Sequence, residues 1–239
     1  MIQEENRKRY MILDGSVLKT IAVVTMLIDQ TAVVLLSNSN TVVFSFAGHV
    51  LTLYTLMRTI GRISFPIYAF LLAEGYVHTR DVKQYALNFL LFAVISEMPW
   101  NLEHTGTFRY ANQNVFFTLL LGLLGIWALD KLRKEPLKLT ASLVCLLVLS
   151  NVIKCDYGIR GFGFILMMYL LREEPFGRAA VGCCILNSTW KAGLAFIPIA
   201  LYNGKRGFIK NEFLKFLFYA VYPIHMMILY WIKLKTIGF

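Results

Sequence analysis

The sequence predicts an all-α, polytopic integral membrane protein with about nine bilayer-spanning helices, in a range of about eight to ten, and a cytoplasmic N-terminus. Of its 239 residues, 57% are hydrophobic and only 16% are charged, whereas soluble domains are roughly 45–50% apolar and about 25% charged. The apolar residues gather in blocks close to the roughly 20 residues that cross a bilayer core. The net charge of +10 comes from basic residues scattered over the short stretches between these blocks, as in cytoplasmic loops of membrane proteins.

The first apolar block covers residues 17–37 and follows a charged stretch, EENRKRY. It is longer than the apolar core of a cleavable signal peptide, and no small-residue cleavage site follows a short core. We therefore expect it to remain as the first span. The further spans are expected at 60–77, 85–100, 113–130, 138–153, 160–171, 178–189, 192–203 and 213–232. Together they predict a single transmembrane domain over residues 1–239.

The stretch 41–57 is apolar enough to span, but it is equally suited to lie along the membrane surface or to dip into it. If it does not span, most of the 24 basic residues fall on the cytoplasmic side. If it does, the basic clusters at 131–138 and 205–215 face outward, against the positive-inside rule. The non-spanning interpretation is therefore favoured, and it places the C-terminus outside.

Ionisable residues inside the apolar blocks are the main functional signal. A charge at the centre of a spanning helix costs at least about 2.5–3.5 kcal/mol, so it persists mainly beside a partner or a water-filled cavity. This number of them predicts a polar interior that serves as a substrate path or a catalytic centre. The residues are Asp29, Arg58, Arg62, Glu74, Glu97, Asp156 and His225, with His78 and Arg80 just beyond a span.

Two pairs of these residues are four positions apart and so share a helix face. Arg58 and Arg62 offer fixed donors for a carboxylate, a phosphate or a developing oxyanion. The alternative is that both extend toward the outer headgroups. Glu74 and His78 are suited either to relay a proton or to cap the inner end of their helix.

Three further features each carry two interpretations. The patch at 78–80 is suited to dock a nucleotide-like anion, or it is an ordinary basic loop. Glu97 precedes Pro99 and His225 follows Pro223, so each combines a titratable group with a proline that frees a backbone carbonyl. Either group is a functional residue or a satisfied member of the core.

Several classes of protein receive no support. The sequence contains no GxxxxGK[ST], GxSxG or HExxH motif, which argues against P-loop, α/β-hydrolase and zincin chemistry. The four cysteines lack metal-site spacing, so they are interpreted as small apolar residues and no metal is expected. The basic residues are too dispersed to suggest a nucleic-acid partner.

The sequence resembles the TraX family over nearly its whole length. Members of this family include the enzyme that acetylates the N-terminal amine of conjugative pilin subunits in the bacterial inner membrane. The family is similar to the wider transmembrane acyltransferase superfamily, whose members use cytoplasmic acyl-CoA. The strings that carry the resemblance are MLIDQTA (26–32), RTIGRISFPIYAFLLAEGYVHTR (58–80), YALNFLLFAVISEMPWNL (85–102), QNVFFTLLLGLL (113–124), CDYGIRG (155–161), YNGKRG (202–207) and FYAVYPIHMMILY (218–230).

The opening LDGSVLKTIAVV (13–24) resembles the start of those acyltransferases, with Asp14, Gly15 and Lys19 in their acidic, glycine and basic positions. In the family a histidine occupies position 30, and this chain has Gln30. Histidine suits general-base work because its pKa lies near neutrality, whereas an amide cannot accept the proton.

Three explanations of Gln30 remain open. The residue is a deliberate inactivating substitution, or a natural loss in a protein that keeps a binding role, or another residue is the base. The candidates for that base are Asp29, His78 and His225.

The resemblance implies an acetyl-CoA-dependent acetyltransferase of the bacterial inner membrane that modifies a small peptide, a pilin-like N-terminus or another amine or hydroxyl acceptor. The alternatives are a non-catalytic peptide-binding or transport protein, and an O-acyltransferase that acts on a surface glycan or lipid. Three sets of site residues follow. The catalytic set is Asp29, Gln30, Glu74 and His225; the substrate-binding set is Arg58, Arg62, Glu97, Asn114, Asp156, Tyr157 and Tyr222; and the set that binds acetyl-CoA is Lys19, His78, Thr79 and Arg80.

Overall fold

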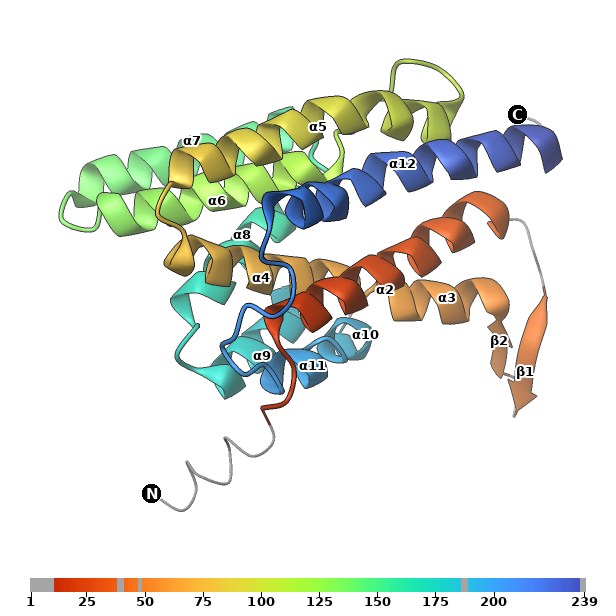
Figure 1. Ribbon diagram of the computed structural model, residues 1–239, viewed down its shortest axis with the longest axis horizontal. Coiled ribbons are helices and arrows are strands. Elements are labelled where there is room, and N and C mark those ends of the chain that lie inside the picture. The colour runs from red at the N-terminus through yellow and green to blue at the C-terminus, as the bar shows by residue number, and fades with distance from the viewer. Residues whose placement is uncertain (1–10, 38–40, 47–48, 186–188, 237–239) are drawn as a thin grey trace. The chain divides into compact units, whose positions relative to one another are not determined.

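The computed structural model describes residues 11–37, 41–46, 49–185 and 189–236, and these are mostly helical (Figure 1). The chain divides into two compact units. The first comprises Met1–Tyr68 with Ser188–Phe239, and the second comprises Ala69–Asn187. The single domain predicted from the sequence stays a prediction.

The first unit is built around helix α2, which packs against α3 and α12. α2 and the α3–α4 segment run antiparallel, because Asp29 lies against Gly61 while Ala22, two turns earlier, accepts a hydrogen bond from the Ser64 hydroxyl at 2.8 Å. The helices of this unit are α2 (Gly15–Leu35), α3 (Leu53–Gly61), the first turn of α4 (Ser64–His78), α10 (Thr189–Gly193), α11 (Phe196–Ala200) and α12 (Glu212–Thr236).

The all-α prediction was wrong for two short segments, β1 (Val42–Phe46) and β2 (His49–Thr52), which pair as an antiparallel two-stranded sheet. The physical reason is the density of β-branched and aromatic side chains there, which favour extended backbone. The hairpin joins α2 to α3. Because these helices are antiparallel, the hairpin lies at one end of the pair, while residues 53–57 belong to α3 (Leu53–Gly61). The non-spanning interpretation of 41–57 stays a prediction.

The second unit centres on α6, which contacts α5, α7 and α8. Gly122 and Gly125 allow α8 to approach closely, because a Cβ at either position would collide with side chains such as Ile165 or Leu166. Phe162, Leu121 and Cys155 form a buried core beside this crossing. The helices of this unit, besides most of α4, are α5 (Val82–Thr105), α6 (Val115–Lys131), α7 (Pro136–Val152), α8 (Gly158–Leu170) and α9 (Pro175–Ile185).

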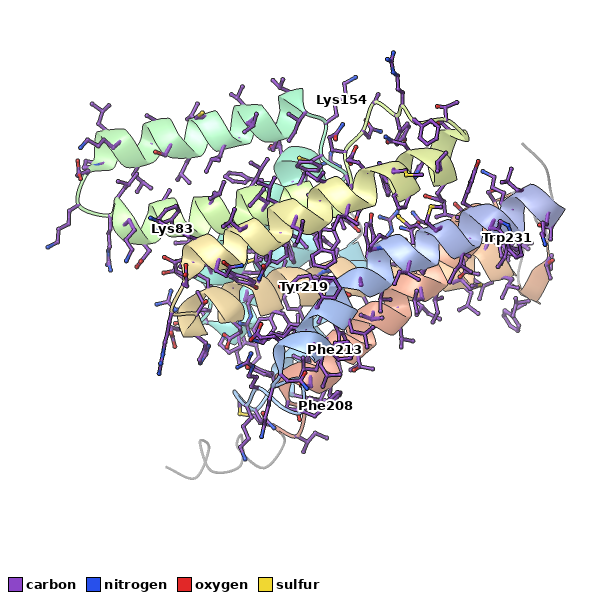
Figure 2. The ribbon with its side chains drawn as sticks, turned by 45° about the horizontal axis from the view of Figure 1, so that its top comes forward. Lys83, Lys154, Phe208, Phe213, Tyr219 and Trp231 are labelled. Carbon is purple, nitrogen blue, oxygen red and sulfur yellow. The ribbon has the colours of Figure 1, made fainter. Side chains whose placement is uncertain are left out.

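Three helical segments of the described chain are long and apolar enough to cross a membrane, by length and composition: Gly15–Leu35, Leu53–His78 and Glu212–Thr236. Figure 2 shows Phe213 near the start of the last segment and Trp231 toward its end. Both side chains are exposed, and aromatic residues near the two ends of a span are typical of membrane proteins.

The predicted span at 192–203 was wrong. This stretch holds α11 and the end of α10, helices of five residues each that are separated by a turn at 194–195. Gly193 and Pro198 interrupt a continuous helix, and a five-residue helix is far shorter than the roughly 20 residues that a span needs. The count of about nine spans stays a prediction.

Candidate functional site

An ion pair of the first unit joins two residues of its candidate spanning segments. Arg58 Nη1 donates to Asp29 Oδ2 at 2.5 Å, and their side chains are 25% and 17% exposed. Asp29 Oδ1 is buried and has no hydrogen-bond partner among the residues that the structure describes. Gly61 permits this geometry, because a Cβ there would overlap the Asp29 side chain. An arginine and a carboxylate with one oxygen still available therefore lie between α2 and α3.

Position 30 is the next residue of α2 after Asp29. Gln30 is partly buried, and its Oε1 atom is buried without a hydrogen-bond partner in the described part of the chain. Such an atom costs free energy unless a ligand or water reaches it. Arg62 lies at the end of α3, where its backbone N–H caps the helix, and its charge also acts on Asp29.

Two other predicted residues of this unit are neighbours on α12. Tyr222 and His225 are 4% and 7% exposed, and their rings meet edge to face at 5.7 Å. His225 Nδ1 lies 2.9 Å from the carbonyl oxygen of Val221, one turn earlier. A bond from Nδ1–H to that carbonyl leaves Nε2 as the nitrogen that can accept a proton.

In the second unit, Glu97 and Asn114 are brought together. Asn114 is fully buried at the start of α6, where its Oδ1 accepts from Phe116 N–H at 3.0 Å. Its Nδ2 donates to Glu97 Oε1 at 2.6 Å and to the Ala93 carbonyl at 2.8 Å. Asn114 thus caps α6 and joins it to α5, while its predicted contact with substrate stays a prediction.

Replacing Asn114 with alanine is expected to lower the free energy of unfolding by about 2–4 kcal/mol. The change removes a helix cap worth about 0.5–2 kcal/mol and leaves the Glu97 carboxylate and the Ala93 carbonyl without this donor. Thermal unfolding of the purified protein in detergent measures the loss. Asn88→Ala is the matched control, because Asn88 contacts the exposed side chain of Gln84; equal losses in the two variants would contradict this role.

The remaining predicted residues of the second unit are more exposed. His78 Nδ1 lies 4.0 Å from the Glu74 carboxylate and 2.9 Å from the Glu74 carbonyl, at the end of α4. Thr79 and Arg80 follow in the connection to α5, with Arg80 exposed. Asp156 and Tyr157 precede α8; Asp156 is exposed and Tyr157 occupies its N-cap position.

Sequence reasoning missed a buried arginine. Arg178 is only 6% exposed, and its guanidinium lies over the Phe70 ring at 4.9 Å from the centroid. It is the first residue of the span predicted at 178–189, and in the structure it belongs to the first turn of α9. Pro175 was the available signal, because proline is common at the first position of a helix and α9 begins there.

A second missed feature is the pair Glu103–His104 at the end of α5. Glu103 is 2% exposed, and its Oε2 lies 2.6 Å from His104 Nδ1. The His104 ring stacks on Tyr110 at 4.9 Å and lies 3.9 Å from the Trp100 ring. Burial lowers the pKa of His104, but the hydrogen bond and the charge of Glu103 outweigh it and the net pKa is raised.

The raised pKa of His104 makes stability depend on pH. A group whose pKa is higher in the folded than in the unfolded protein stabilises fully below its unfolded value, about 6.5 for histidine. This contribution is lost as the pH rises through the folded value. We expect the melting temperature difference between wild type and His104→Gln to be largest below about pH 6.5, the unfolded value, and to shrink as the pH rises above it. A constant difference would contradict the assignment.

A cysteine nucleophile gains no support from the buried thiol. Burial raises the pKa of Cys155 to about 11, and the thiolate is the reactive form. The side chain packs in the core with Leu121 and Phe162, as expected for a small apolar residue.

Comparison with known proteins places the chain in a family. The model of the TraX family, described as TraX protein, matches residues 14–233. A relative described as "Probable fimbrial assembly protein FimC, serogroup H1", from Dichelobacter nodosus, is 27% identical over 241 residues, covering 89% of this chain and 92% of the relative. No solved structure shows significant similarity. The family match covers nearly the whole chain, and the chain therefore belongs to the TraX family.

Proposed function

We propose that this membrane protein is an acetyltransferase that moves an acetyl group from acetyl-CoA to the N-terminal amine of a membrane-associated, pilin-like peptide in the bacterial inner membrane. The observation that carries the proposal is the Asp29–Arg58 ion pair. It lies next to position 30 in a chain that belongs to the TraX family. The name of the Dichelobacter relative, a fimbrial assembly protein, supports an acceptor related to pilin.

The proposed reaction proceeds in three steps. The acceptor amine attacks the thioester carbonyl and loses a proton, an oxyanion forms and collapses, and CoA leaves as a thiolate that takes up a proton. Arg58 and Arg62 supply fixed positive charge for the oxyanion. Lys19, His78, Thr79 and Arg80 are proposed to bind the acyl donor, with Glu97, Asp156, Tyr157 and Tyr222 on the acceptor side.

The mechanism requires a base other than position 30. Gln30 cannot accept a proton, so the proton passes to Asp29, His78 or His225, or the chain reacts slowly. His225 is suited to this task because Nε2 is the nitrogen able to take up a proton when Nδ1–H bonds to the Val221 carbonyl. Under this proposal, the protein binds acetyl-CoA and transfers the acetyl group more slowly than a family member with histidine at position 30.

The decisive experiment measures acetyl-CoA binding and acetyl transfer to a pilin-like peptide by the purified protein and by Gln30→His. Binding by both with faster transfer by the histidine variant supports an acetyltransferase that lacks its usual base. Equal transfer by both moves the base to Asp29 or a histidine. Absence of binding in both refutes the proposal.

A second candidate is a non-catalytic protein that binds or transports a peptide, which Gln30 itself favours. Acetyl-CoA binding without transfer, even after Gln30→His and with a peptide acceptor, would support it. An O-acyltransferase acting on a surface glycan or lipid is distinguished by the acceptor that becomes acetylated.

A further inference from the structure

A basic loop lies against the first turn of α2 in the first unit. Residues 201–209 include the YNGKRG string, and Lys205 and Arg206 of this loop contact Gly15: a Cβ at Gly15 would lie 3.3 Å from the Arg206 carbonyl oxygen and 3.4 Å from that of Lys205. Lys19 follows Gly15 by one helical turn and so shares its face of α2. We propose that Lys19, Arg206 and Lys215 bind a phosphate group where α2 and α12 begin.

The loop is held in place by its main chain. Gly15 N–H donates to the Lys205 carbonyl at 2.8 Å, and the Ser16 hydroxyl donates to the Arg206 carbonyl at 2.9 Å while accepting from Ile209 N–H at 2.8 Å. Gly207 has φ +83°, and a Cβ there would collide with Asp14 and Ser16. These bonds leave the side chains of Lys205 and Arg206 exposed and available to a ligand.

The cations of this cluster outnumber the acids near them. Arg206 and Lys215 both act on Lys19 through their charges, although Lys19 is itself partly buried. Asp14 is engaged, because it accepts from Ser16 and Val17 N–H as the N-cap of α2. The exposed Glu212 pairs with Lys215, and because a surface ion pair contributes little to stability, a phosphate can replace Glu212 beside Lys215. Like charges held together on a fixed backbone favour an anion between them.

A phosphate is the anion that this arrangement suits. Its oxygens accept hydrogen bonds from several directions at once, and arginine and lysine both bind it with charge-assisted hydrogen bonds. Two sources supply the same chemistry in a membrane: the nucleotide part of CoA and the headgroup of an anionic phospholipid. The CoA source rests on the proposed acetyltransferase function, whereas the lipid source does not.

The test compares the double variant Arg206→Gln/Lys215→Gln, called the loop variant, with wild type in nanodiscs of neutral lipid. Neither substitution touches the main-chain bonds of the loop, so the variant is expected to unfold near the wild-type temperature. The matched control, Lys233→Gln/Lys235→Gln, removes the same charge at the other end of α12, near Trp231 (Figure 2). There Lys235 Nζ lies 3.6 Å from the centroid of the Trp231 ring.

Binding of CoA and of 3′-dephospho-CoA is measured first, and the proportion of phosphatidylglycerol that copurifies from mixed lipid is measured second. A hydrogen bond to a charged group contributes enough that each lost cation weakens binding roughly tenfold. A loss of about 10²-fold in CoA affinity, confined to the loop variant, assigns the phosphate to CoA. Weaker binding of 3′-dephospho-CoA by wild type would identify the 3′-phosphate as the group.

Selective loss of phosphatidylglycerol from the loop variant assigns the phosphate to lipid instead. If both ligands bind the loop variant as they bind wild type and the control, the phosphate site is refuted, while undiminished CoA binding leaves the acetyltransferase proposal standing. If wild type binds neither CoA nor phosphatidylglycerol, the site and the acetyltransferase proposal both fail.

Discussion

Replacing Gln30 with histidine is expected to raise the rate of acetyl transfer by about 10²–10⁴-fold, the usual contribution of a positioned general base. Gln30 is partly buried in α2, and its Oε1 atom lacks a hydrogen-bond partner among the described residues. An imidazole there has a nitrogen able to take the proton that the acceptor amine loses. Single-turnover assays with acetyl-CoA and a peptide acceptor measure the gain.

Asp29 is expected to act on such a histidine through its charge. Successive side chains of a helix do not face each other, and Asp29 Oδ2 is already held by Arg58. The carboxylate favours the protonated form of a nearby imidazole, which supports proton uptake. The activity of Gln30→His should therefore fall when Asp29 is also replaced with asparagine.

The control for this prediction is Gln30→Asn, which keeps an amide and changes only the length of the side chain. It should transfer acetyl groups at the wild-type rate. A histidine variant no faster than Gln30→Asn, with acetyl-CoA bound by both, would mean that position 30 has no role as a base in this chain.

Much of the helical structure was predictable because local chemistry determines it. The first block at 17–37 corresponds to α2 (Gly15–Leu35), and the last at 213–232 corresponds to α12 (Glu212–Thr236). The predicted and observed helix ends differ by a few residues, because capping residues determine where a helix begins and ends. Asp14 accepts from two N–H groups of the first turn and begins α2 before its apolar block starts.

The errors arose where apolar content was interpreted without backbone preference. In 41–57 the apolar residues include Val42, Val43 and Val50, whose branched side chains favour strands. In 192–203 the average hydrophobicity of the block did not reflect Gly193 and Pro198, which break a helix. Hydrophobicity predicts burial or lipid contact, but it does not separate a hairpin or a broken helix from a span.

The site was predictable as a set of residues, but its contacts were not. Buried charges pointed to Asp29 and Arg58 separately, whereas their pairing joins residues 29 positions apart. Such a contact depends on how α2 packs on α3. Arg178 was missed for a related reason, since only the packing of α9 shows that its guanidinium lies over Phe70.

Replacing Arg58 with glutamine is expected to lower the free energy of unfolding by about 2 kcal/mol, between the value for an exposed ion pair and the cost of breaking a fully buried one. The change leaves the Asp29 carboxylate, which is 17% exposed, without its charged donor. Thermal unfolding in detergent measures the loss. Arg62→Gln is the control, because Arg62 acts on Asp29 through its charge without the hydrogen bond that Arg58 makes.

The double variant Arg58→Gln/Asp29→Asn separates the pair from its two parts. With both charges removed, neither variant side chain faces a buried unpaired charge, so the double variant should be more stable than the sum of the two single losses predicts. A coupling energy of about 1–3 kcal/mol is expected. Additive losses would mean that the two side chains contribute independently, and that the charge of Asp29 is not held in place by Arg58 for the chemistry proposed at position 30.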